Sequence, residues 1–186
     1  MAEADHGRVR VRPRYASLLR IRGVAKLIEI KDKTTGAILH QIDARRLDKA
    51  NLAGLCLRNA NLAGAALSKA TLRGTDLENA DFSFANLSYS DLEGAVLAGA
   101  NFNCAMLIQT RMVQADLRRA NLKNASLFQA DLRAATLTGA QLAGADLTEC
   151  DLTNADVTHA VFDERTRWPH GFDPLEGGAV QDAQPG

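Results

Sequence analysis

Hydrophobic residues recur at every fifth position over most of this chain. From Leu47 to Phe162 all 24 such positions are apolar, and 19 of them are leucine. The position two residues earlier in each unit is small, with 18 alanines among 24. Between these two columns lies a polar residue, most often Asn, Asp or Thr. The chain therefore repeats the unit A-[D/N]-L-x-x without a break or an insertion, which is a sign of repeat architecture.

A period of five does not fit regular secondary structure. In an α-helix five residues turn by about 500°, so the leucine column would spread around the axis. In a flat strand an odd step places successive leucines on opposite faces. Both columns stay inside only if the chain turns once in each unit and coils around an axis. The pattern therefore predicts a solenoid in which Ala and Leu point inward and the other three residues point outward.

The run from Ala50-Asn51-Leu52-Ala53-Gly54 to Ala160-Val161-Phe162 resembles the pentapeptide-repeat family over about 118 of 186 residues. This resemblance implies an all-β fold, a right-handed quadrilateral β-helix with four units in each coil. About six coils, stacked at the strand spacing of ~4.8 Å, would make a rod roughly 29 Å long. An interior of Leu and Ala packed layer on layer has no room for a substrate.

Both ends of such a rod need a cap, because open coils expose unpaired backbone groups. Two β-rich runs around the turn 31–36 predict a β-hairpin cap over residues 24–44. At the other end Trp168-Pro169-His170-Gly171-Phe172-Asp173-Pro174 resembles a W-P-x-G-F-D-P tail of related bacterial proteins. The expected organisation is then a basic N-terminal arm (1–23), the hairpin cap (24–44), the β-helix (45–162), a C-terminal cap (163–176) and a disordered tail (177–186).

Charge is balanced overall but unevenly spread. Lys and Arg number 22, as do Asp and Glu, so the formal net charge is zero. Residues 1–46 carry eleven basic and five acidic residues, whereas residues 47–162 carry nine basic and twelve acidic ones. The neutral total argues against a polyanion mimic and against a typical nucleic-acid binder.

The cysteine content and the apolar runs bear on where the protein works. Cys56, Cys104 and Cys150 form an odd, sparse set without C-x-x-C spacing, which is typical of free thiols in a reducing compartment. No apolar run approaches the roughly 20 residues of a membrane span, and no apolar h-region near the N-terminus indicates a signal peptide. We expect a soluble, cytoplasmic bacterial protein.

Signatures of catalysis are missing from the sequence. It contains no H-x-x-x-H, H-E-x-x-H, C-x-x-C or G-x-S-x-G motif and no Gly-rich phosphate loop. Three of the four histidines, His6, His40 and His170, lie outside the repeats, and His159 lies in the last coil. We expect no enzyme, no cofactor and no metal site.

Positions twenty residues apart should align on one face of the rod. One such face carries Tyr89, Met106, Ile108 and Phe128 at outward positions, with Ile108 and Phe128 on adjacent coils. An apolar cluster at the middle of a flat face is typical of an interface, although scattered apolar residues are normal on soluble proteins. We expect these four residues to contact a second copy in a homodimer or a protein partner of unknown identity.

The leading functional hypothesis is a non-catalytic protein-binding or scaffolding module. The alternative is a DNA mimic that binds and protects a type II topoisomerase, as in the quinolone-resistance members of the family, but the rod carries a net charge of only −3. A third hypothesis is contact with nucleic acid or an anionic surface through Arg8, Arg10, Arg12 and Arg14. No stacking platform accompanies these arginines, so a solvated tail is the favoured interpretation.

Overall fold

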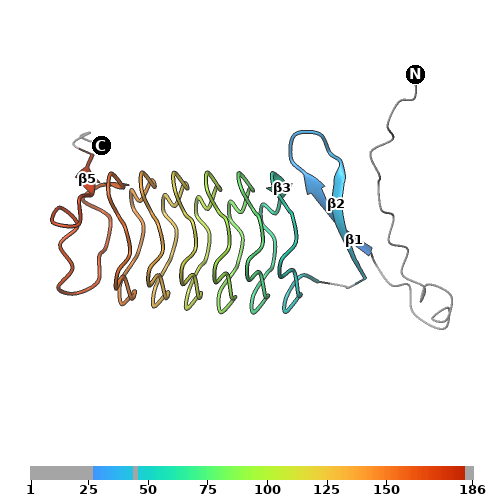
Figure 1. Cartoon of the computed structure of the whole chain (residues 1–186), viewed down its shortest axis with the longest axis horizontal. Helices are drawn as coiled ribbons and strands as arrows, with labels where there is room; N and C mark the ends of the chain where they lie inside the picture. Colours follow the sequence, from blue (N-terminus) through green and yellow to red (C-terminus); the bar gives the residue numbers. More distant parts are fainter. Residues whose placement is uncertain (1–26, 44–45, 183–186) are drawn as a thin grey trace, which may run out of the picture.

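The computed structural model describes residues 27–43 and 46–182 of the 186-residue chain. Within these ranges it contains strands, bridges and turns but no helix. Figure 1 shows a rod of stacked coils with a hairpin at one end and the C-terminal segment at the other. The prediction of an all-β repeat fold is confirmed.

Each coil of the rod is built from four units. Parallel bridges join the residue before each central leucine to its equivalent twenty positions later, from Asn51 and Thr71 to Gln141 and Val161. One more bridge joins Asp146 to Arg167, twenty-one positions later. In the first of these steps, the Leu52 amide donates to the Thr71 carbonyl at 2.8 Å and the Thr71 amide donates to the Ala50 carbonyl at 2.9 Å. Backbone groups that would be unpaired in a single coil are therefore satisfied by its neighbours. We call the column of bridging residues on each side of the rod a strip.

A tight turn follows each strip and makes a corner of the coil. The Ala50 amide donates to the Leu47 carbonyl at 3.0 Å, and equivalent bonds recur along the rod. The third residue of the turn has a positive φ at every fifth position from Lys49 to His159, including Phe84 at 58° and Tyr89 at 63°. Such a conformation costs a residue with a side chain about 1–2 kcal/mol. Hydrogen bonds between equivalent turns of adjacent coils offset this strain.

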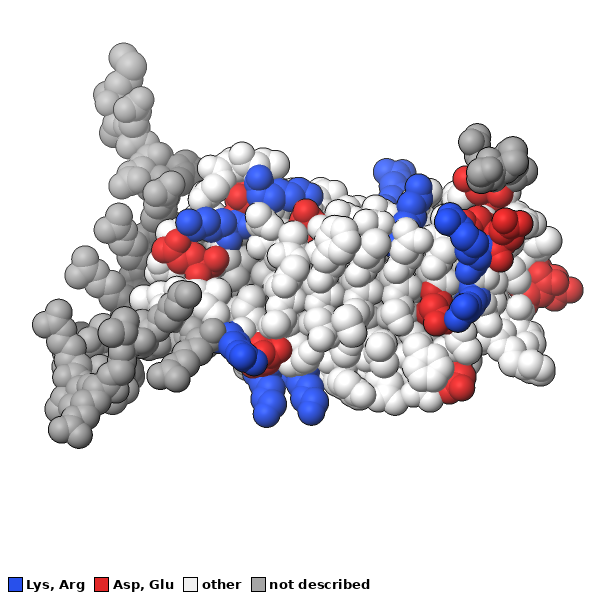
Figure 2. All heavy atoms as spheres, turned by 180° about the vertical axis from the view of Figure 1, so that it is seen from behind, with Lys and Arg blue, Asp and Glu red and all other residues white. Residues whose placement is uncertain are grey.

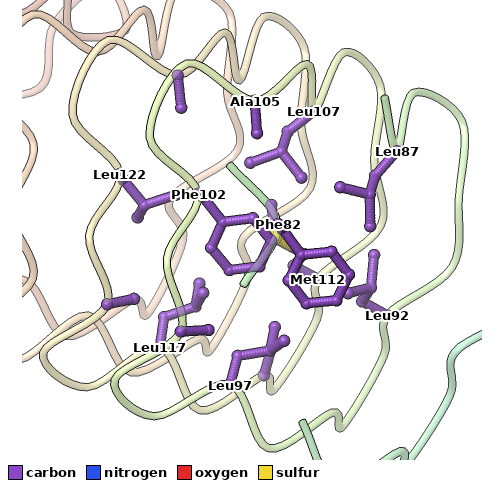
Figure 3. Packing of buried hydrophobic residues seen from close by; sticks show 14 of the residues in the cluster. Phe82, Leu87, Leu92, Leu97, Phe102, Ala105, Leu107, Met112, Leu117 and Leu122 are labelled. Atoms are coloured by element: carbon purple, nitrogen blue, oxygen red, sulfur yellow. The ribbon is translucent and has the colours of Figure 1, made fainter. Parts of the chain in front are cut away.

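The leucine and alanine columns form one continuous core. Central residues such as Leu87, Leu97 and Leu107 are fully buried, and Figure 3 shows their side chains converging inside the coils. Phe82 and Phe102 stack on each other with ring centroids 4.9 Å apart and an interplanar angle of 1°. Burying each large side chain stabilises the fold by roughly 1.5–3 kcal/mol.

Two threonines and a cysteine in the alanine column bond to the coil before them, whereas the buried hydroxyl of Ser90 has no hydrogen-bond partner. The hydroxyl of Thr75 donates to the Leu52 carbonyl at 2.8 Å, and that of Thr110 donates to the Leu87 carbonyl at 3.0 Å. Cys150 makes the same contact, its thiol donating to the Leu127 carbonyl at 2.8 Å. Burial raises the pKa of this thiol to about 12, so it stays protonated and able to donate.

The N-terminal end is covered by an antiparallel hairpin. Its strands are β1 (Leu27–Asp32) and β2 (Ile38–Asp43), and β1 also pairs with β3 (Ala60–Asn61) of the first full coil. Ile30 is buried against the first coils. The Asp32 carboxylate accepts hydrogen bonds from Thr34 and from the Thr35 amide, and these bonds hold its pKa well below the usual range. The hairpin thus pairs the open edge of the rod.

The C-terminal end is closed by aromatic rings and by a short strand. Trp168 meets Phe162 edge-on at 5.5 Å and stacks on Phe172 at 5.3 Å. Strand β5 (Val180–Gln181) runs parallel to β4 (Val161–Phe162). We expected disorder over 177–186, but within residues 177–182 strand β5 pairs with the last coil. The reason is that the open coil has backbone carbonyls to satisfy, and amides from this segment donate to two of them at 2.7 Å.

Candidate functional site

Metal-binding side chains do not cluster in the described part of the chain. Across 27–43 and 46–182, no three or more His, Cys, Asp or Glu side chains gather where they could hold a metal ion. Those same residues include no helix that is long and apolar enough to span a membrane. Cys56 is exposed, Cys104 is half-buried and Cys150 is buried, and all three are free thiols. The candidate site is therefore sought on the surface of the rod.

Four residues were predicted to form an interface, and the structure places them on one side of the rod. Met106 lies in a strip between Asn86 and Ser126, and it is 45% exposed. Tyr89, Ile108 and Phe128 lie in turns along one corner beside that strip. Tyr89 is 55% exposed, whereas Ile108 and Phe128 are half-buried.

The position of these residues differs in one respect from the expectation. We expected all four at the middle of a flat face, but only Met106 lies in the strip. The other three lie at the corner because the two residues after each central leucine form the turn. The expected alignment of Ile108 with Phe128 is present, since the Gln109 amide donates to the Phe128 carbonyl at 2.9 Å and holds the two turns together. Arg8, Arg10, Arg12 and Arg14, the predicted anionic-partner residues, lie outside the described residues.

Sequence reasoning left Phe84 out of this cluster. It is 67% exposed and lies in a turn at the opposite corner of the same strip, one coil from Cys104. Grouping residues by unit assigned Phe84 to the preceding face. A corner borders two faces, however, so its side chains can serve either of them. The sequence signal that could have identified Phe84 is a bulky residue in a column that holds glycine at Gly64 and Gly144, which is typical of a turn.

The strip that contains Met106 carries no charge over the middle of the rod. The corner that follows this strip in the chain is also uncharged there. We define the uncharged face by the strip residues Asn86, Met106 and Ser126 and the corner turns 88–89, 108–109 and 128–129. Basic side chains precede it at Lys49 and Lys69, and acidic ones follow it at Asp146 and Glu149. Figure 2 shows a side of the rod whose central part lacks Lys, Arg, Asp and Glu, with charged groups gathered toward both ends.

The corner of the uncharged face is an ordered column of side chains. The Lys69 ammonium lies 5.7 Å from the centroid of the Tyr89 ring, within the range of a cation–π contact. Further along, the Gln109 amide donates to the Gln129 side chain at 2.6 Å, and Gln129 donates to the Glu149 carboxylate at 2.6 Å. These contacts hold the cation at one end of the corner and the anion at the other.

The neighbouring side of the rod is charged, and we call it the charged face. Its strip contains Asp91, Arg111 and Asp131, and its turns add Arg73, Glu93 and Arg133. Asp91 lies 3.2 Å from Arg73 and 3.4 Å from Arg111, and both arginines also pair with Glu93. Hydrogen bonds from Arg133 hold the pKa of Asp131 below its ordinary value, against the opposing effect of burial. The charges of this face thus find partners within the rod.

Comparison with known proteins decides the family. A profile described as "Pentapeptide repeats (8 copies)" matches residues 46–83, and one described as "Pentapeptide repeat region" matches residues 85–162. The chain belongs to the pentapeptide-repeat family. Members of this family are generally non-catalytic. The family's right-handed quadrilateral β-helix agrees with the four units per coil seen here.

Solved structures of this family resemble the chain. A pentapeptide-repeat protein, Rfr23, from the cyanobacterium Cyanothece 51142 is 38% identical with a TM-score of 0.50, and the match covers 50% of this chain and 63% of that one. The protein alr5209 from Nostoc Pcc 7120 is 32% identical with a TM-score of 0.48, covering 66% and 84%. QnrB1, a plasmid-mediated fluoroquinolone resistance protein, is only 15% identical with a TM-score of 0.46, covering 73% and 81%. A search of curated proteins found no match.

Proposed function

We propose that this pentapeptide-repeat protein is a non-catalytic protein-binding or scaffolding module that uses the uncharged face as its contact surface. The observation that carries the proposal is the gathering of exposed apolar side chains on one side of the rod. Phe84, Tyr89 and Met106 are the exposed large hydrophobic residues of the described repeats, and each lies in the same strip or at one of its two corners. Exposed apolar patches of this kind mark interaction sites on soluble proteins.

The composition of the uncharged face suits an interface. Interface cores are depleted of charge and enriched in aromatic residues and Met. Tyr89, Met106, Ile108 and Phe128 supply its apolar part, and Phe84 adds an exposed ring at the opposite corner of the strip. Burying each large side chain is worth roughly 1.5–3 kcal/mol. The backbone beneath them is hydrogen-bonded from coil to coil, so binding does not have to order it. The three free thiols suit a reducing compartment, and a cytoplasmic location is part of the proposal.

The alternative function, protection of a topoisomerase by DNA mimicry, has weaker support. Such a mimic needs a continuous acidic surface, whereas Arg58, Arg73, Arg111, Arg118 and Arg133 each pair with acidic neighbours on this rod. We expect that equimolar purified protein gives DNA gyrase no protection from a quinolone in a supercoiling assay. Clear protection would favour mimicry over the scaffold.

Affinity capture tests the proposed surface directly. The full-length chain serves as bait in native extract, as wild type and as the variants Met106→Glu and Gln141→Glu. Met106→Glu adds a charge to the strip of the uncharged face, whereas Gln141→Glu adds the same charge to a strip on another side of the rod. We expect Met106→Glu to lose the proteins that wild type retains and Gln141→Glu to keep them. Equal capture by all three baits would show that the uncharged face is not the contact surface.

A further inference from the structure

We infer that the partner of the uncharged face is a second copy of this chain, bound antiparallel about a two-fold axis. This inference rests on the proposed function, because it names the occupant of the same surface. It comes from the order of side chains along the corner column. That column reads Lys69, Tyr89, Gln109, Gln129 and Glu149 at successive coils.

The corner column is regular enough for distances along it to be compared. The Lys69 amide donates to the Ser88 carbonyl at 3.1 Å, and the Tyr89 and Gln109 amides make the equivalent bonds at 2.9 Å. Each turn is therefore fixed to the next, one coil spacing of about 4.8 Å further on. Lys69 and Glu149 lie two coils from Gln109 on either side, about 10 Å each way.

The two-fold axis passes through the corner at Gln109, perpendicular to the rod and in the plane of the face. Rotation about this axis places the second rod face to face with the first, with its long axis reversed. It keeps the same corner in register, so Lys69 of each copy lies opposite Glu149 of the other. Tyr89 then lies opposite Gln129, and Phe128 meets the turn that carries Tyr89. An isologous contact of this kind must be complementary to itself, and the column meets that condition because its charges have opposite signs at equal distances from the centre.

Further charges border this surface. Lys123 lies at the other corner of the strip, and the axis would place its turn opposite the turn that carries Phe84. Arg167 bridges to Asp146 at one end of the strip, and Arg46 stands twenty residues before Ala66 at the other end, so the axis would bring the two arginines together. Each is already close to a carboxylate, Arg46 at 3.8 Å from Asp48 and Arg167 at 3.9 Å from Asp146. Neutral pairs therefore meet at the ends. The middle of the contact contains only uncharged residues of the strip and corner.

Charge reversal distinguishes this dimer from other contacts. Lys69→Glu places like charges opposite each other at both ends of the dimer, as does Glu149→Lys. In an equimolar mixture of the two variants, both contacts of the mixed dimer regain opposite charges. We expect wild type to dimerise in sedimentation velocity, each variant alone to dimerise at least about tenfold more weakly, and the mixture to recover the wild-type affinity. Lys69 and Glu149 are exposed, so thermal unfolding of both variants should match wild type at concentrations low enough for all three proteins to be monomeric.

A disulfide test checks the position of the axis. Gln109→Cys and Gln114→Cys are matched changes, because both glutamines are exposed and occupy the positive-φ position of successive turns. In a background with Cys56→Ser and Cys104→Ser, mild oxidation should link two copies through position 109 and leave the position 114 variant unlinked. Equal linkage through both positions, or none through position 109, would overturn the antiparallel arrangement.

The outcomes separate this inference from the proposed function. If wild type stays monomeric at all concentrations, or if the mixture dimerises no better than its components, the second copy is not the partner. The proposed function still stands in that case, provided that Met106→Glu loses proteins that the wild-type bait captures. If Met106→Glu captures as wild type does, the proposed function itself fails.

Discussion

The uncharged face and the charged face share the same core and the same kind of turn, but they differ in whether their side chains find partners within the rod. On the charged face Arg73 and Arg111 bind Asp91 and Glu93 from adjacent coils, so polar groups are satisfied within the rod. On the uncharged face Tyr89 and Met106 remain about half exposed. The repeat therefore determines the backbone and the core, while the outward positions can vary and specify binding.

The largest expected effect comes from breaking the interior that both faces share. Leu107 is fully buried in a middle coil. Leu107→Asp would place a carboxylate in a dry aliphatic stack, at a cost of several kcal/mol. We expect the variant to unfold at a much lower temperature or to be insoluble. Gln114→Asp, at an exposed turn on another corner of the rod, is the control and should melt close to wild type. A normal melting curve for Leu107→Asp would mean that the inward column is misassigned.

A second comparison uses two phenylalanines of the same unit. Phe82 is buried and stacked on Phe102, whereas Phe84 is 67% exposed at the corner. Phe82→Ala should reduce the free energy of unfolding by about 3–5 kcal/mol, because it leaves a cavity in the core. Phe84→Ala should change it by no more than about 0.5 kcal/mol. Urea denaturation measures both, and similar losses would show that Phe84 supports the fold rather than binding.

Both predictions concern the core, whose residues could be predicted from the sequence. A period of five identifies the inward residues, so the core around Phe82, Phe102 and Leu107 follows from the pattern alone. It does not say where in each unit the chain bends, and for that reason Ile108 and Phe128 were expected on a flat strip. The bend depends on a positive φ that Tyr89 adopts without being glycine. Strand β5 was missed because two residues that pair with the last coil leave no periodic signal.

A smaller effect separates the two faces by their response to salt. Arg111→Gln on the charged face removes ion pairs with Asp91 and Glu93, and it should reduce the free energy of unfolding by up to about 1 kcal/mol at low salt. In roughly 1 M salt most of this loss should disappear, because exposed charges are screened. Gln109→Ala on the uncharged face should show no such dependence. A loss for Arg111→Gln that is unchanged by salt would mean that packing, not charge, holds the charged face.

The smallest effect is expected in acid, again from the charged side of the rod. Hydrogen bonds from Arg133 lower the pKa of Asp131 below the ordinary value of 3.8. The stability that this pairing contributes is therefore present above pH ~4 and is lost as the pH falls through the lowered pKa. Asp131→Asn should flatten the decline of the unfolding temperature below pH 4. Ser126→Ala on the uncharged face should follow the wild-type curve. If Asp131→Asn follows it as well, the Asp131 carboxylate does not contribute to the loss of stability in acid.

The central claim, that the uncharged face is the functional surface, is tested most directly by photo-crosslinking in living cells. The photoreactive residue p-benzoyl-phenylalanine replaces either Met106 or Val96, which are both apolar strip residues but lie ten residues apart on opposite sides of the rod. We predict a discrete crosslinked product from position 106, either with a second copy or with another protein, and none from position 96. Products of equal yield from both positions, or from position 96 alone, would contradict it.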